Sequence, residues 1–346
     1  MKGFWRGLWL IASIELRQRV RGVAWYVLLG VFVVLLLIVT ILLAITLNVT
    51  ASAAGTSDAG AGIFSTIIYF VLLLGTLVAP AVSGNAINGD REAGTLATTQ
   101  VTLVTTAQLV LGKFLAAWLT ALAFLVVSIP FLIAAQVLGG VQGSTIGVSI
   151  LVLAVELGVV AAVGVGLSGI VRRPLFSLVV TYLVVAALSV GTLIGFALGG
   201  VVVETRITTH SSYDDGTGTC ITEDSTSMQP SFNRVWWILA ANPYVVLADA
   251  VPTHYRGSDP DDLFGLIKLG VRSAQIPPET SQSYVDCPTA QVDSPQPTSR
   301  QIIDSTVPSW FVGLLLQLAL AVAALLVATR LTRAPSRRLA EGSRIA

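Results

Sequence analysis

Long apolar runs separated by short polar stretches organise the whole chain. Six of these runs are long enough for a helix to cross a hydrocarbon core, which takes about 20 residues. They span residues 24–47, 63–82, 114–138, 145–171, 175–203 and 310–329. The pattern therefore predicts an all-α polytopic membrane protein with six transmembrane helices.

Composition agrees with a membrane location. Hydrophobic residues make up 54% of the 346 positions and charged residues 11%, whereas a soluble domain has about 25% charged residues. The first run is also longer than the roughly 7–15-residue apolar core of a cleaved signal peptide, so we interpret it as an uncleaved anchor.

The distribution of Lys and Arg over the short loops predicts the orientation. The segments with basic residues are residues 1–23, the loop with Arg91, the Arg172-Arg173 turn and the tail at residues 331–346. The loops at residues 48–62 and 139–144 contain no Lys or Arg. Because cytoplasmic loops carry an excess of these residues, both termini are predicted to be cytoplasmic.

Residues 1–23 fit an amphipathic helix lying along the membrane surface. At 100° per residue one sector holds Lys2, Arg6, Ser13 and Arg17, and another holds Trp5, Leu8, Trp9, Ala12 and Leu16. Trp is frequent at headgroup depth, so we interpret the segment as an interfacial helix with its basic side toward anionic lipid. The alternative is a charged flank of the first span.

Residues 204–308 are predicted to form a large extracytoplasmic insertion between the fifth and sixth spans. This polar block contains 13 Asp and Glu against 6 Lys and Arg, and both cysteines of the chain. Disulfides persist in oxidising compartments, so we predict a bridge between Cys220 and Cys287. Two free thiols are the alternative.

One apolar stretch, residues 235–251, lies inside this block and is interrupted by Asn242-Pro243. A seventh span here would move the basic tail to the outer side, against the charge rule. We therefore predict a short broken helix at or dipping into the outer leaflet.

Glu156 is the only formal charge well inside a predicted span. A carboxylate in the hydrocarbon core costs about 2.5–3.5 kcal/mol, so Glu156 is expected to face the bundle interior, a water-filled path or a partner chain. Two roles stay open: a pathway or gating group, or a neutral glutamic acid hydrogen-bonded between helices.

Small residues recur at four-residue spacing in the fourth and fifth spans. They are Gly158, Ala162 and Gly166, then Gly191, Gly195 and Gly199. Such stripes let helix backbones approach closely, which predicts packing inside the bundle; a dimer seam is the alternative.

The loop at residues 84–113, between the second and third spans, carries the most specific motif. The motif is Asp90, Arg91, Glu92, Gly94 and Thr95, and the junction with the third span is Gly112 and Lys113. We predict a short helix with both acids in its first turn, where the helix dipole favours them, and with the glycine at its end. Docking on a partner and a merely solvated loop are the two interpretations.

No enzyme motif is present. A P-loop needs a glycine six positions before its lysine and a Ser or Thr directly after it, whereas Lys113 has Ala107 and Phe114 at these positions. The chain therefore does not bind nucleotide phosphates in that way. His210 and His254 lack the spacing of a zinc protease, and no Gly-x-Ser-x-Gly elbow occurs. We predict that the chain is not an enzyme and binds no cofactor or metal.

The loop motif, which continues as Ala93-Gly94-Thr95-Leu96 and ends in Leu111-Gly112-Lys113, resembles the first cytoplasmic loop of ABC-2 type transporter permeases. Further similarity lies in Glu15-Leu16-Arg17 before the first span and in Gly166-Leu167-Ser168 before Arg172-Arg173. The likeness covers the membrane part and not the outer block. The Asn242-Pro243 break also resembles the re-entrant elements of that family.

The resemblance implies the permease subunit of a bacterial ABC exporter, resident in the plasma membrane. It implies two permease chains, as a homo- or heterodimer, with two separate ATP-binding subunits that hold ATP and Mg. Coupling would pass through Asp90–Thr95 and the Arg172-Arg173 turn, and a hydrophobic or amphipathic substrate would be exported. Membrane lipid is the other partner, and no nucleic acid is expected.

Two other classes of function stay open. One is an ion-coupled secondary transporter with Glu156 as proton carrier, which would transport without ATP. The other is a non-transporting membrane module whose outer block binds a ligand, which would copurify with no ATPase.

Overall fold

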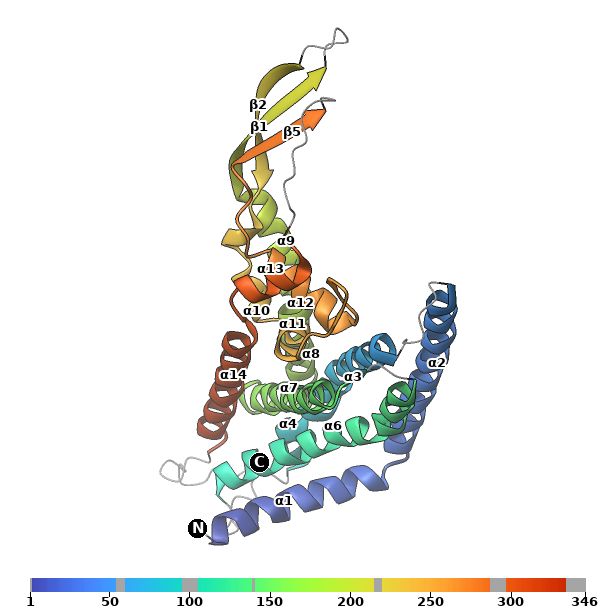
Figure 1. The fold of residues 1–346 in the computed structure, drawn as a ribbon. Coiled ribbons are helices and arrows are strands. Elements are labelled where there is room, and N and C mark those ends of the chain that lie inside the picture. Colours follow the sequence, from blue (N-terminus) through green and yellow to red (C-terminus); the bar gives the residue numbers. More distant parts are fainter. Residues whose placement is uncertain are drawn as a thin grey trace. The chain divides into compact units, whose positions relative to one another are not determined.

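Figure 1 shows a computed structural model of the chain, which describes residues 2–53, 60–94, 105–138, 141–214, 220–286 and 297–333. The chain divides into two compact units. We call Met1–Ala187 with Leu314–Ala346 the membrane unit and Leu188–Gly313 the insertion unit. Each unit contains its own cluster of buried apolar side chains.

Six helical stretches are long and apolar enough to cross a membrane, one for each predicted run. They are α2 (Val23–Ala53), α3 (Gly60–Ser83) with α4 (Ala86–Glu92), α6 (Thr106–Val137), α7 (Gly143–Ile170), α8 (Pro174–Ala186) with η1 (Ala187–Gly191) and α9 (Thr192–Val202), and α14 (Trp310–Leu331). The structure thus confirms a mostly helical chain with six candidate spans.

Helices α3 and α7 form the buried centre of the membrane unit. A Cβ atom added at Gly164 of α7 would meet the Ser83 hydroxyl of α3 at 1.9 Å, and one at Gly75 of α3 would meet Leu157 of α7 at 2.3 Å. The two backbones therefore approach as closely as they do because glycine stands at these contacts. Helix α6 packs against both of them.

The N-terminal segment forms α1 (Lys2–Arg21), which runs along α6 (Figure 1). Its inner side buries Leu8 and Ala12, whereas Trp5 and Trp9 are 64% and 58% exposed. Helix α1 thus has one packed side and one exposed aromatic side. Its place at the membrane interface stays a prediction.

The insertion unit contains a β-sheet, so the prediction of an all-α chain was wrong there. Strands β1 (Glu204–Asp214) and β2 (Cys220–Pro230) pair antiparallel, and β5 (Ser281–Asp286) pairs parallel to β1, giving the order β2-β1-β5. Strand β1 reads ETRITTHSSYD, and its Thr, Ile and Tyr residues favour an extended backbone. The strands carry few apolar residues, which is why the apolar pattern did not reveal them.

Short helices make up the rest of the insertion unit. In chain order they are η2 (Phe232–Arg234), α10 (Trp237–Ala240), α11 (Pro243–Ala250), α12 (Leu263–Ser273) and α13 (Ser299–Ser305), with the small hairpin β3 (Tyr255–Arg256) and β4 (Asp259–Pro260) before α12. Leu239, Val245 and Val271 form the core that holds α10, α11 and α12 together.

Candidate functional site

Helix α4, which carries the charged loop motif, is fixed to the end of α7. The backbone N–H groups of Ile87 and Asn88 both donate to the Ser168 hydroxyl, at 2.9 and 3.1 Å. The Asn88 amide also donates to the carbonyl of Val171 at 2.6 Å. These N–H groups belong to the first turn of α4, which has no partner within its own helix. A side chain of α7 therefore caps α4 and holds it in place.

The two acids of the motif lie at the opposite end of this helix from the predicted one. Because α4 begins at Ala86, Asp90 and Glu92 stand in its last turn, and the prediction of a first-turn position was wrong. There the helix dipole disfavours acids by about 0.3–1 kcal/mol each, so other groups must compensate. The glycine behaves as expected: Gly94 follows the helix with a positive φ of 69°.

Lys113 supplies that compensation for Asp90. Its side chain is 2% exposed, and its ammonium lies 2.8 Å from the Asp90 carboxylate and in a second ion pair with Glu15. Lys113 stands in the second turn of α6, Asp90 in α4 and Glu15 in α1. One buried cation therefore joins three elements that are far apart in the sequence.

Gly112 explains how α1 comes close enough for this arrangement. A Cβ atom there would lie 2.8 Å from the Ile11 Cβ and 3.0 Å from the Leu8 carbonyl oxygen, both in α1. About two turns further along α1, Arg19 donates to the Thr120 hydroxyl at 3.1 Å and to the Val82 carbonyl at 3.3 Å. Helix α1 is thus held on α6 and at the end of α3.

The remaining charges of the motif face outward. Glu92, Ala93 and Gly94 are exposed, as are Arg172 and Arg173 in the turn between α7 and α8. Arg91 is partly buried, donates to the Asn88 side chain, and lies close enough to Arg172 for their like charges to interact. We call Glu92, Arg172 and Arg173 the loop surface. Thr95, the last residue of the predicted motif, lies outside the described residues.

A family model described as ABC-2 family transporter protein matches residues 9–334. The match covers both units and all six candidate spans. The chain belongs to the ABC-2 transporter family. Members of this family are transmembrane subunits and not themselves catalytic. A search of curated proteins found no match.

In this ABC-2 permease, Glu156 lies inside the helical bundle. The residue is 1% exposed, and its Oε1 atom has no hydrogen-bond partner among the described residues. One turn further along α7, Val160 packs against Ala79 of α3 and Val185 of α8, so this side of α7 faces two other helices. Both predicted roles of Glu156, the pathway group and the structural group, stay predictions.

The two small-residue stripes pack differently. In the first, a Cβ at Gly158 would lie 3.0 Å from the Trp118 indole, one at Gly166 would lie 2.5 Å from the Ala324 Cβ, and Ala162 is buried beside Ala321. The first stripe thus packs α7 against α6 and α14. In the second, a Cβ added at Gly195 would lie 3.7 Å from Ile238 and one at Gly199 would lie 3.3 Å from Val235, and Gly191 is exposed.

The apolar stretch of the insertion is broken at Asn242-Pro243. Asn242 caps α11, accepting the Tyr244 N–H, and its amide donates to the Ser189 carbonyl at 2.7 Å and to the Thr192 hydroxyl at 2.9 Å. Ser189 lies in η1, a π-helical turn, where widened geometry leaves a carbonyl to be satisfied. The break therefore docks on the fifth span. Its membrane depth stays a prediction.

The predicted disulfide also stays a prediction. Cys220 is the first residue of β2, and β5 ends at Asp286. Cys287 lies outside the described residues. Asp286 pairs with Tyr213 and Cys220 with Asp214, so β5 ends and β2 begins beside the same end of β1, on its two opposite sides.

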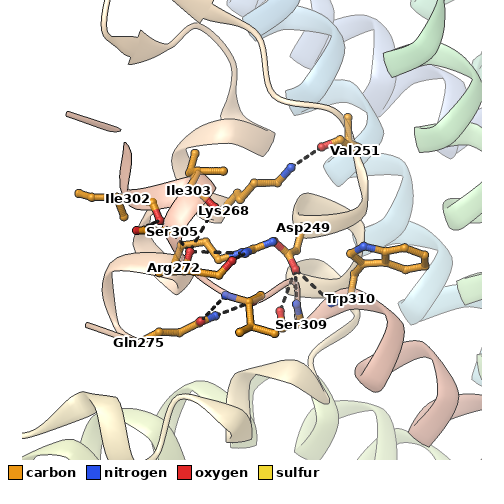
Figure 2. Close-up of polar contacts among 12 residues, drawn as sticks. Asp249, Val251, Lys268, Arg272, Gln275, Ile302, Ile303, Ser305, Ser309 and Trp310 are labelled. Atoms are coloured by element: carbon orange, nitrogen blue, oxygen red, sulfur yellow. Dashed lines mark hydrogen bonds and ion pairs between the residues drawn. The ribbon is translucent and has the colours of Figure 1, made fainter. Parts of the chain in front are cut away.

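A buried ion pair in the insertion unit was missed by the sequence analysis (Figure 2). Asp249 of α11 accepts the Arg272 Nε of α12 at 2.8 Å, and their side chains are 0% and 5% exposed. The other Asp249 oxygen accepts the Ser309 N–H at 2.6 Å and the Trp310 N–H at 3.0 Å, at the start of α14. Arg272 also donates to the Thr306 carbonyl at 2.6 Å. One carboxylate thus connects α11, α12 and the first residues of α14.

The start of α12 is expected to be pH-sensitive through Asp262, whose carboxylate accepts the Gly265 N–H at 2.7 Å. Burial, with a smaller contribution from Asp261, raises the pKa of Asp262 to about 6 from 3.8, against the opposing effects of Gly265, His254 and Lys268. Between these values the folded state binds more protons than the unfolded state, so stability rises as pH falls through 6. From pH 7 to 5 we expect α12 to open roughly tenfold less often, measured by hydrogen exchange.

Asp262→Asn is the matched control for this effect. Asparagine is an equally good N-cap but does not titrate, so the variant should lose the part of the pH dependence that comes from Asp262. The same pH dependence in both proteins would contradict the assignment to Asp262.

Proposed function

We propose that this chain is the membrane-spanning subunit of an ATP-driven exporter for hydrophobic or amphipathic molecules. A separate ATP-binding subunit, which carries ATP and Mg, docks on the loop surface from the cytoplasm. The observation that carries the proposal is a short helix with an exposed end, α4, whose first turn is held by α7 and whose Asp90 pairs with the buried Lys113 of α6. The excess of Lys and Arg in the neighbouring loops supports the cytoplasmic side.

The contacts of α4 provide a route by which docking acts on the spans. Ser168 connects α4 to α7, and Lys113 connects it to α6 and α1. Because these contacts are buried and α4 has only seven residues, a displacement of α4 moves the ends of these helices with it. The bundle then alternates between two arrangements while the partner hydrolyses ATP.

A second permease chain completes the proposed transporter. In the most apolar stretch of α2 only 11% of the residues are buried within the chain, and in that of the fifth span, α8 to α9, only 17%. The apolar faces of these helices must be covered by lipid or by another subunit. The chain is therefore proposed to act as a dimer, homo- or heteromeric, in the bacterial plasma membrane.

Reversing the charge at Glu92 tests the docking proposal. Glu92→Lys is expected to reduce copurification of the ATP-binding subunit and ATP-driven transport at least tenfold. Since Glu92 is exposed, the free energy of unfolding should change by no more than about 0.5 kcal/mol. Pull-down from mildly solubilised membranes and transport in vesicles measure these effects.

Glu204→Lys provides the same charge change at an exposed position of the insertion unit and should leave both readouts unchanged. Full assembly and turnover of the Glu92→Lys variant would contradict the proposed docking surface.

The buried Glu156 favours one alternative, a proton-coupled transporter. Its unpaired oxygen inside the bundle is the observation behind this candidate. In vesicles with the permease alone, this alternative predicts transport driven by a pH gradient and abolished by Glu156→Gln. Transport that requires the ATP-binding subunit and ATP, and that is unchanged in Glu156→Gln, excludes it.

A further inference from the structure

Four charged side chains form a row of ion pairs beside the last turn of α4. Lys113 pairs with Asp90 at 2.8 Å and with Glu15, and the Glu15 carboxylate lies 4.0 Å from the Arg19 guanidinium. The Lys113 side chain is 2% exposed, whereas that of Glu15 is 18% and that of Asp90 27% exposed. The buried cation therefore lies between two acids, of which Asp90 is the more accessible to water.

Lys113 and Glu15 belong to two helices that are packed tightly together. The Gln108 amide of α6 donates to the Phe4 carbonyl of α1 at 3.0 Å. The close approach of the two backbones at Gly112 lies directly beside Lys113. These contacts hold α1 and α6 as one pair of helices, so the ion pair between Lys113 and Glu15 stays closed when neighbouring elements move.

Asp90 stands on a different element, whose two ends are held differently. The first turn of α4 is fixed, because Ser168 of α7 accepts its N–H groups and Ile87 is fully buried in an apolar cluster with Val110 of α6. The last turn of α4 ends at the exposed Glu92. The ion pair of Asp90 thus holds the exposed end of α4 against α6.

Glu15 lowers the free energy that is needed to separate Asp90 from Lys113. A buried cation that loses its acid is strongly destabilising. With Glu15 in place, Lys113 keeps one acid after Asp90 has moved away, and the partly exposed Asp90 carboxylate moves toward water, where it is solvated. The Asp90–Lys113 pair can therefore open without leaving a buried charge unpaired.

We propose that the Asp90–Lys113 pair opens and closes once in each transport cycle, and that Glu15 is the positioning residue that keeps Lys113 paired while it is open. This role rests on the proposed function, in which the ATP-binding subunit acts on the exposed end of α4. While the pair is closed, a displacement of α4 is transmitted to α6. Once the pair opens, the end of α4 is released and Lys113 stays beside Glu15.

Hydrogen exchange of the full-length permease in nanodiscs tests this role. Asp90→Asn removes the ion pair, so the amides of α4 are expected to exchange at least fivefold faster. Glu15→Gln has the opposite expected effect. Opening then leaves Lys113 without an acid among the described residues, so the amides of α4 should exchange at least fivefold more slowly. If Glu15 only anchored α1, α4 would exchange faster in both variants.

Transport measurements separate the role of Glu15 from the proposed function. The Glu15→Gln permease should copurify with the ATP-binding subunit as the unchanged protein does, yet ATP-driven transport should be at least fivefold slower. Glu15→Asp keeps the charge and should restore both exchange and transport. Arg17→Gln removes an exposed charge of α1 and should alter neither.

The two failures are distinguishable. ATP-dependent transport together with unchanged or faster α4 exchange in Glu15→Gln would overturn the role of Glu15 and leave the proposed function intact. Slower α4 exchange in Glu15→Gln together with transport that needs no ATP would support the opening of the pair and overturn the proposed function.

Asp90→Asn also tests the role of Glu15 if the Glu15→Gln protein does not fold. Because Glu15 still pairs with Lys113 in this variant, exchange of α6 around Lys113 should stay within twofold of that in the unchanged protein while α4 exchanges faster. A larger increase in α6 would show that Glu15 does not keep Lys113 in place and would contradict the proposal.

Discussion

Arg272→Met is expected to destabilise the insertion unit by about 3–5 kcal/mol, the range for removing one partner of a buried ion pair. The upper part of the range applies, because the Asp249 carboxylate is fully buried and would lose the cation with which it forms its ion pair. Its remaining partners are the Ser309 and Trp310 N–H groups and the Ser309 hydroxyl. Hydrogen exchange of α11, α12 and the first turn of α14 measures the effect.

Arg234→Met is the control, since Arg234 is an exposed arginine of the same unit and its loss should change stability by about 0.5 kcal/mol at most. The paired variant Asp249→Asn with Arg272→Met leaves no isolated charge, so it should be less destabilised than Arg272→Met. If the single variant matched the control, the ion pair would not hold the unit together.

Lys113→Met is expected to have the largest effect in the membrane unit. It removes the ammonium that pairs with both Glu15 and Asp90, in a site where the lysine side chain is 2% exposed. Glu15 keeps Arg19 at 4.0 Å as a cation. Because the two acids keep exposures of 18% and 27%, we expect about 3 kcal/mol, the lower end of the range for buried pairs. Thermal unfolding in detergent measures this loss. Arg6→Met, which removes an exposed cation of α1, is the control with which the loss is compared.

A second readout separates coupling from stability. Asp90→Asn combined with Lys113→Met removes one of the two acids and should recover part of the thermal stability. ATP-driven transport should stay at least tenfold reduced, because the ion pair between Asp90 of α4 and Lys113 of α6 is still missing. Normal transport by this double variant would show that the Lys113 contact does not transmit force.

The membrane architecture was predictable because run length alone determines it. Each apolar run of about 20 residues can satisfy its backbone in lipid only as a helix, and each of the six is a helix in the structure. Gly94 was also predictable, since a glycine after a short charged segment is a common helix end. The family followed from the loop motif and is confirmed by the match over residues 9–334.

Long-range partners were not predictable from a local pattern. Lys113 and Glu15 are 98 positions apart, and nothing in the sequence around Lys113 indicates that its ammonium is buried between two acids. The same holds for Asp249, whose partners lie 23 and 60 positions further along. The start of α4 was misjudged because the prediction began the helix at its charged residues, whereas the uncharged Ala86 and Ile87 already belong to its first turn.

The sheet of the insertion unit has one strand edge that carries carboxylates. Strand β2 pairs only with β1 among the described residues, and Thr222, Glu223, Asp224 and Ser225 on it are exposed. A free strand edge invites another strand to add to it, and carboxylates on that edge oppose such pairing. In the proposed dimer, two such strand edges facing each other would bring four carboxylates together, and this repulsion would oppose their pairing into one continuous sheet.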